Sequence, residues 1–225
     1  MIEKIKNGLI VSCQATPEEP LHSSYIMGKM AFAAKVGGAV AIRAAGVNDI
    51  IQIKRDTDLP VMGLIKKNYK KSEVYITPTK LEVKKLIESP CEMIALDATL
   101  RERPDKSQLR ELVDMIHESG KLALADISTF EEAVNAQNVG FDLVSTTLSG
   151  YTDYSPKSDE PDYKLIKKCV KELKIPVVAE GRISTLEQLK KVMKLKPHSV
   201  VIGSAITRPQ LITKAFVEII DKYKH

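Results

Sequence analysis

Short apolar runs alternate with amphipathic, helix-like segments along the whole chain, and this alternation constrains the fold more than any other feature. About eight such runs recur at a spacing of roughly 25 residues, a pattern typical of repeated βα units. The runs are almost continuously apolar, which indicates strands buried on both faces of a parallel sheet. Eight βα units in 225 residues predict a closed (β/α)8 TIM barrel, a single domain over residues 1–225. An open, doubly wound α/β sheet is the alternative, because strands near the chain ends are the hardest to count.

Capping residues and glycines mark where the predicted elements begin and end. We expect strands at residues 9–13, 39–42, 61–65, 93–96, 122–125 and 141–145, with the last two inside 176–209. Helices are expected at residues 23–36, 47–58, 80–89, 107–119, from 128, 162–173, between the last two strands, and 208–222. A short extended piece is expected at 73–76 within the loop that follows the third strand.

The composition is that of an ordinary globular protein with a packed core. Hydrophobic residues make up 44% of the chain and charged residues 28%. The sequence contains nothing near the roughly 18 consecutive apolar residues that a membrane span needs, and its first residues lack the apolar run of a signal peptide. We therefore expect a cytoplasmic protein without a membrane partner.

The cysteines and histidines form no disulfide or metal-binding pattern. The three cysteines are far apart, with no CxxC pair, so we expect small buried apolar side chains. The histidines lack the spacing of metal ligands, and no metal site is predicted. These residues are Cys13, Cys91 and Cys169, and His22, His117, His198 and His225.

The net charge of +5 does not by itself indicate a nucleic-acid partner. The lysines are spread through amphipathic segments, as in Lys167-Lys168 and Lys190-Lys191, which is typical of solvated helix faces. No nucleic-acid partner is predicted, whereas a small anionic substrate is compatible with this charge.

Polar residues follow nearly every predicted strand. In a (β/α)8 barrel the catalytic groups lie at the carboxyl ends of the strands. A polar residue there can also simply cap a helix, and for the aspartate and threonines of the fourth and sixth strands both interpretations stay open. The residues are Gln14, Arg43, Lys66, Asp97, Asp126, Thr146 or Thr147, Glu180 and Gly203.

A lysine and a glutamate at two of these ends favour proton transfer next to a carbonyl group. Burying both charges without a use is costly, and epimerisation needs a base and an acid on opposite faces of one carbon. Lys66 can act as the base if its surroundings keep it neutral, with Glu180 as its partner. Arg43 can hold the substrate or stabilise negative charge, and Asp126 can orient Lys66 or a substrate hydroxyl.

Two glycine-containing strand ends predict a phosphate site. Barrels build such sites after strands seven and eight, where backbone N–H groups approach the anion. Gly181 and Arg182 follow one strand, while Gly203, Ser204 and Arg208 follow the other. A tight turn at Gly203 and a surface position for Arg182 are the alternatives.

The segments around these strand ends carry the pattern of a known enzyme family. They are IVSCQ (10–14), EPLH (19–22), AIRA (41–44), GLIK (63–66), ITPT (76–79), LDAT (96–99), ADIS (125–128), STTLSGYT (145–152), EGR (180–182) and GSAITRP (203–209). In these segments, across nearly its whole length, the chain resembles the N-acetylmannosamine-6-phosphate 2-epimerase family.

This resemblance implies a TIM-barrel enzyme of sialic-acid catabolism that interconverts N-acetylmannosamine 6-phosphate and N-acetylglucosamine 6-phosphate without a cofactor. It implies a homodimer, and a serine, Ser204, stands where the family usually has a second glycine. The implied catalytic pair is Lys66 and Glu180; the implied substrate-holding residues are Gln14, Arg43, Asp126 and Arg208, with phosphate at the Gly181 and Gly203 ends.

Two other functions are compatible with the same residues. Lys66 could form a Schiff base in an aldolase or lyase. A noncatalytic phosphosugar-binding or regulatory protein would keep the pocket without turnover, although the joint presence of Lys66 and Glu180 disfavours it.

Overall fold

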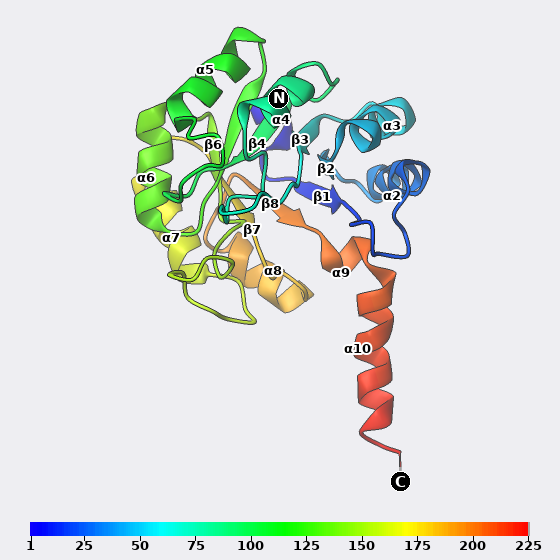
Figure 1. Ribbon diagram of the computed structural model, residues 1–225. Helices are drawn as coiled ribbons and strands as arrows, with labels where there is room; N and C mark the ends of the chain where they lie inside the picture. The colour runs from blue at the N-terminus through cyan, green and yellow to red at the C-terminus, as the bar shows by residue number, and fades with distance from the viewer. Residues whose placement is uncertain (225) are drawn as a thin grey trace.

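The computed structural model describes residues 1–224 as a parallel β-barrel surrounded by helices (Figure 1). His225, one of the histidines considered above, lies outside the described residues. Within this range eight strands pair in chain order, and β8 pairs with β1 to close the barrel. The closed (β/α)8 barrel is thus confirmed, and the open sheet is wrong. The strands are β1 (Leu9–Cys13), β2 (Ala41–Ala45), β3 (Val61–Leu64), β4 (Met93–Asp97), β5 (Leu122–Asp126), β6 (Leu143–Ser145), β7 (Val177–Glu180) and β8 (Ser199–Ile202).

Most helices follow a strand and cover the outside of the barrel, whereas the first precedes β1 and packs Ile5 into the interior, and the last projects away from the barrel (Figure 1). Side-chain caps start several of them, as where Thr129 and Glu132 form a capping box. The helices are α1 (Ile2–Ile5), α2 (Ser24–Val36), α3 (Val47–Thr57), α4 (Lys80–Ile87), α5 (Leu109–Glu118), α6 (Phe130–Val139), α7 (Tyr163–Glu172), α8 (Leu186–Met193), α9 (Ser204–Thr207) and α10 (Pro209–Asp221).

Alternation along each strand separates two apolar layers. On β4, Ile94 and Leu96 pack outward against the helices, while Met93 and Ala95 pack into the barrel interior. The next inward position on this strand is Asp97, at its carboxyl end. Inward positions at the ends of other strands are polar as well, so the apolar interior is capped by a polar layer.

Arg43 lies deeper in the barrel than predicted. The strand expected at 39–42 instead spans Ala41–Ala45, so Arg43 is its central residue and is only 1% exposed. Arg43 follows an apolar run and looked like its end, but buried carboxylates satisfy its charge and let the strand continue. Asp97 and Asp126 were also expected to follow their strands, and they are instead the last residues within them.

Smaller differences concern the chain ends and loops. Helices α1 and α9 were not predicted, and the strand expected at 141–145 is shortened to Leu143–Ser145. The extended piece expected at 73–76 is present as an antiparallel bridge between Lys66 and Ile76. This bridge ties the loop after β3 to the residue that follows the strand.

The cysteines behave as predicted. All three are buried and unpaired, and burial raises the pKa of Cys13 and Cys169 to about 12. None of the helices in residues 1–224 combines the length and apolar character needed to cross a membrane.

Candidate active site

A cavity of about 460 Å³ opens at the carboxyl ends of the strands. It is the place where a (β/α)8 barrel carries its site. Every residue given a catalytic, substrate or phosphate role from the sequence lines this cavity, except Asp126, which lies behind Arg43. Asp97, whose role was left open, does not line it and pairs with Arg101 at 2.8 Å. The lining residues that were predicted are Gln14, Arg43, Lys66, Glu180, Gly181, Arg182, Gly203, Ser204 and Arg208.

Arg43 joins two carboxylates at the floor of the cavity. Its Nη2 donates to Asp126 Oδ2 at 2.6 Å, and its Nη1 lies 3.4 Å from Glu180 Oε2. Burial works against the charged guanidinium, but the negative charges of Asp126 and Glu180 together raise the pKa of Arg43. Arg43 therefore stays charged where a substrate can meet it.

Asp126 does not orient Lys66, which was one of the two roles considered for it. Its second oxygen, Oδ1, accepts a hydrogen bond from Thr147 Oγ1 at 2.6 Å. No hydrogen bond or ion pair joins Asp126 to Lys66 in the described part of the chain. Asp126 forms its ion pair with Arg43 instead.

Glu180 is held from both its backbone and its side chain. Thr146 Oγ1 donates to the Glu180 carbonyl at 2.8 Å and accepts from its N–H at 3.1 Å. Oε2 of Glu180 lies 2.9 Å from Thr147 Oγ1 and 3.1 Å from Ser145 Oγ. Burial raises the pKa of Glu180; Arg43 opposes this shift, and the negative charge of Asp126 adds to it. The glutamate therefore keeps a proton at higher pH than an exposed one.

Lys66 reaches into the cavity directly after β3 and keeps contact with solvent there. None of the ion pairs within residues 1–224 involves its ammonium. The pKa of Lys66 is lowered because the cavity walls desolvate it, and because Arg43 and Arg208 add positive charge nearby. A larger share of neutral amine is the result, as a base requires.

Arg208 lines the cavity between α9 and α10 and is held in place there. Glu19 holds it twice, at 2.7 Å to Nε and 3.1 Å to Nη2, and Ser204 Oγ accepts from Nη1 at 3.2 Å. Gly203 precedes α9, and a Cβ atom there would lie 3.3 Å from Ser12 Cβ. The chain therefore packs closely against β1 at this strand end.

The turn after β7 has the left-handed backbone that favours glycine. Gly181 has φ of +112° and Arg182 has φ of +56°. The Arg182 guanidinium donates to the carbonyls of Ser149 and Glu160, in the loop between β6 and α7. Arg182 therefore lines the cavity while its hydrogen bonds hold the loop between β6 and α7 in place.

Two residues of the site carry buried polar atoms without a hydrogen-bond partner in residues 1–224. They are Oε1 of Gln14, and Nε and Nη1 of Arg43. Leaving such a group unpaired costs about 1–3 kcal/mol, so groups of this kind are normally paired with a ligand or with water. Oε1 of Gln14 thus remains an acceptor, and Nε of Arg43 a donor, for a polar molecule in the cavity, whereas Nη1 of Arg43 already lies 3.4 Å from Glu180 Oε2.

The sequence interpretation missed Tyr75, Ser145 and Glu19. Tyr75 lines the cavity from the loop after β3, and burial raises its pKa to about 12. Ser145 was predicted only as the end of an apolar strand. It stands two residues before Thr147, and this spacing predicts that both side chains lie on the same face of the strand. No sequence signal pairs Glu19 with Arg208, because 189 positions separate them.

Comparison with known proteins identifies the family. Residues 27–222 match the family model described as "Putative N-acetylmannosamine-6-phosphate epimerase". The chain belongs to the N-acetylmannosamine-6-phosphate epimerase family.

Similar proteins match over nearly their full length. A relative from Clostridium perfringens is 59% identical over 220 residues, covering 98% of this chain and 100% of that protein. One from Clostridioides difficile is 58% identical over 221 residues, covering 98% and 99%. Both are described as "Putative N-acetylmannosamine-6-phosphate 2-epimerase".

A solved structure of the Clostridium perfringens N-acetylmannosamine-6-phosphate 2-epimerase superposes with a TM-score of 0.96 at 59% identity, covering 97% of this chain and 96% of that one. Thiamine phosphate pyrophosphorylase from Pyrococcus furiosus has a TM-score of 0.60 at 18% identity, covering 92% and 89%. At that identity the likeness concerns the fold alone.

Proposed function

We propose that this chain interconverts N-acetylmannosamine 6-phosphate and N-acetylglucosamine 6-phosphate by removing and returning a proton at C2. One observation carries the proposal: Lys66 and Glu180 line the same cavity, with the pKa of the lysine lowered and that of the glutamate raised. Family membership supports the choice of substrate. The reaction fits a step of sialic-acid catabolism.

The chemistry follows from the open-chain form of the sugar. Its C2 proton lies next to the C1 aldehyde, so removing it gives an enediolate whose charge is spread onto oxygen. A base on one face and an acid on the other invert the carbon. Lys66 and Glu180 take these roles and exchange them when the reaction runs backwards, while the Arg43 guanidinium stabilises the enediolate.

The remaining site residues hold the substrate. Gln14 offers its unpaired Oε1 to a hydroxyl or amide N–H of the sugar, and Asp126 acts through Arg43. The phosphate binds at the other end, near Arg208, which Glu19 already holds in place. The backbone at Gly181, Gly203 and Ser204 completes this end, and Arg182 adds positive charge to it.

Proton exchange with solvent tests this function directly. In deuterated water, purified protein should convert N-acetylmannosamine 6-phosphate to its C2 epimer, with deuterium at C2 of the product by NMR. Lys66→Ala and Glu180→Ala should each lose about 100-fold or more in kcat, because each removes one proton-transfer group. Ser199→Ala is a suitable control, since this buried β8 hydroxyl has no hydrogen-bond partner in residues 1–224.

Lack of turnover by the folded wild-type protein would contradict the proposal. Borohydride added with substrate should leave the protein mass unchanged. A covalent adduct on Lys66 would point to Schiff-base chemistry instead.

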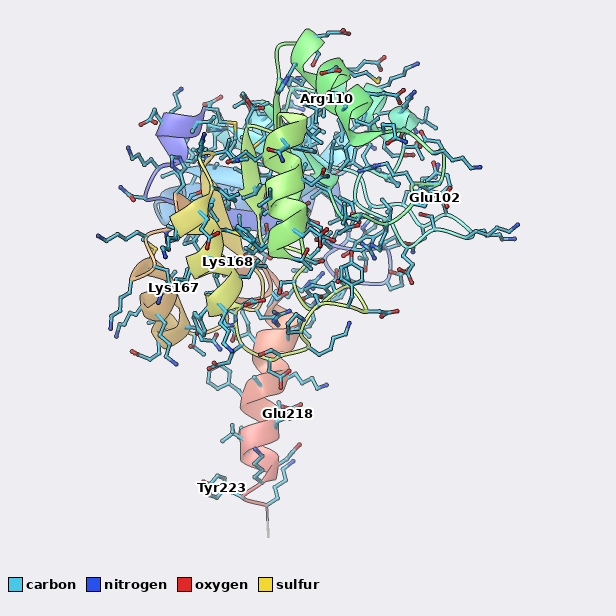
Figure 2. The ribbon with its side chains drawn as sticks, turned by 90° about the vertical axis from the view of Figure 1, so that its left-hand side faces the viewer. Glu102, Arg110, Lys167, Lys168, Glu218 and Tyr223 are labelled. Carbon is cyan, nitrogen blue, oxygen red and sulfur yellow. The ribbon has the colours of Figure 1, made fainter. Side chains whose placement is uncertain are left out.

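We further propose that residues 1–225 form one catalytic domain that works as a homodimer built through α10. This helix projects beyond the barrel in both views (Figures 1 and 2) and buries none of its residues. Phe216 and Ile220 are 70% and 60% exposed, and their spacing of four puts them on one face, while Tyr223, 78% exposed, lies just past the end of the helix. An apolar helix face of this kind is best covered by a second copy, which buries the same helix reciprocally.

The cytoplasm is the proposed place of action. Sugar phosphates are charged and do not cross membranes unaided, so an enzyme that uses them works where they are formed. Three free, buried thiols are compatible with a reducing compartment. Cell fractionation with an antibody against the protein would test this location.

A further inference from the structure

We propose that Asp126 and Glu180 share one retained proton through the hydroxyl of Thr147, which makes Thr147 a positioning residue for the acid of the reaction. The inference rests on the proposed function for its catalytic meaning. Its structural basis is a compact group of four side chains at the ends of β5, β6 and β7.

The oxygen atoms of this group lie within hydrogen-bond distance of one another. Thr147 Oγ1 lies 2.6 Å from Asp126 Oδ1, 2.8 Å from Ser145 Oγ and 2.9 Å from Glu180 Oε2. Ser145 Oγ also lies 3.1 Å from Glu180 Oε2. Asp126 and Ser145 are fully buried, so bulk water does not separate these oxygens.

The hydrogens of the two hydroxyls are too few for these contacts. Thr147 and Ser145 bring one hydrogen each, and two ionised carboxylates bring none. With both carboxylates ionised, Thr147 can donate to Asp126 or to Glu180 but not to both. The other short approach then sets an oxygen lone pair against an oxygen lone pair. One added proton resolves the two contacts between Thr147 and the carboxylates, because a protonated carboxyl donates to Thr147 while Thr147 donates onward.

The proton belongs on Glu180 rather than on Asp126. Arg43 is much closer to Asp126, at 2.6 Å, than to Glu180, at 3.4 Å, and so favours an ionised aspartate. The chain of donors then runs from Glu180 through Thr147 to Asp126. Burial and the charge of Asp126 raise the pKa of Glu180 against the opposing effects of Arg43, Thr147 and Ser145, and this net direction agrees with the assignment.

The other groups around Glu180 leave this assignment in place. Arg43 of β2 and Lys66 after β3 are the cations that face it, and Asp126 of β5 is the anion. The positive charge of Arg43 is shared with Asp126, and the pKa of Lys66 is itself lowered. On the β8 side, Glu180 is paired in register with the apolar Val201.

A retained proton gives the epimerase its acid. When the enediolate is protonated, the O–H bond of Glu180 breaks, a C2–H bond forms from the enediolate electron pair, and Glu180 is left ionised. Lys66 holds the proton taken from the other face. Because Lys66 keeps contact with solvent, it can release that proton and the carboxylate pair can regain one before the next turnover.

Infrared spectroscopy of the substrate-free enzyme tests the proposal without relying on turnover. Wild-type protein near neutral pH should show the C=O band of a protonated carboxylic acid, and Glu180→Gln should abolish it. Thr147→Val, which replaces the hydroxyl with a methyl group, should also lose the band. Thr147→Ser and the control Ser199→Ala should keep it.

Kinetics supply the second readout. Thr147→Val should lower kcat about 10- to 100-fold, part of what an acid group contributes, and should move the loss of activity caused by Glu180 ionisation to lower pH. Thr147→Ser should recover activity to within a few-fold of wild type. A merely structural role for Thr147 would leave the pH profile unmoved.

A carboxylic acid band that survives Glu180→Gln, or that Thr147→Val leaves unchanged, would overturn the proposal. If Thr147→Val fails to fold, the carboxylic acid band is measured in Thr147→Ala, which should also lose it. The loss of the band in Glu180→Gln relative to wild type then assigns the proton to Glu180. A wild-type enzyme with the expected band but no epimerase activity would contradict the function and leave the shared proton standing.

Discussion

At the scale of single residues, the site depends on what each ionisable group faces rather than on its type. Lys66 and Glu180 are ordinary residues whose titration is altered by the cavity: burial and two arginines lower the pKa of the lysine, whereas burial and Asp126 raise that of the glutamate. The two shifts converge, so the pH range in which the amine is neutral and the range in which the carboxyl is protonated move toward each other.

A bell-shaped pH dependence of kcat/KM is the expected consequence. Activity should rise with pH as Lys66 loses its proton and fall as Glu180 loses its own, because the active form has a neutral lysine and a protonated glutamate. Since one pKa is lowered and the other raised, both limbs should lie between the ordinary values of about 4.3 and 10.4. A profile measured over this range with limbs at those ordinary values would contradict the shifts.

At the scale of elements, strand-end turns set where the backbone of the site lies. Gly181 follows β7 with φ of +112°, a conformation that side chains rarely adopt. A Cβ atom at this position would meet Thr146 O at 3.6 Å, which is ordinary contact. Backbone strain rather than a clash therefore explains the need for glycine after Glu180.

Gly181→Ala should destabilise the protein by about 1–3 kcal/mol, the cost of a strained backbone at one residue. It should also raise KM, because relaxation of the turn would move the backbone at the proposed phosphate end. Thermal unfolding and steady-state kinetics measure the two effects. Gly37→Ala is the matched control: its φ of −74° suits alanine, so little change is expected. Equal stability of the two variants would argue against strain at Gly181.

At the scale of the whole molecule, the feature without an explanation inside one chain is α10. It starts beside Arg208, leaves the barrel, and exposes its apolar face along its length (Figure 1). Figure 2 shows Glu218 on the projecting helix and Tyr223 just past its end, both away from the barrel. The homodimer proposed above gives the apolar face a partner.

Phe216→Glu combined with Ile220→Glu should convert a dimer to a monomer, because like charges on the apolar face would have to be buried without partners. Light scattering coupled to size-exclusion chromatography should then give half the wild-type mass. Glu218→Gln, on the opposite face, should leave the mass unchanged. A wild-type protein that is monomeric at high concentration would refute the dimer, and a doubly substituted protein that stays dimeric would place the interface elsewhere.

The sequence by itself determined the barrel and most of the cavity lining. Apolar runs must be buried on both faces, and a polar residue that ends such a run is carried to the carboxyl edge, where Lys66, Glu180 and Gly203 lie. The local sequence pattern is enough for this prediction. A residue that ends an apolar run lies at the carboxyl end of its strand, and in a parallel sheet all these ends share one edge.

Only the tertiary structure decided which residues meet. Closure of the barrel buried Arg43 between Asp126 and Glu180, and it brought Glu19 to Arg208 across 189 positions. It also set Thr147 between two carboxylates. Pairings, pKa shifts and a shared proton depend on distances between distant parts of the chain, and no local sequence pattern contains those distances.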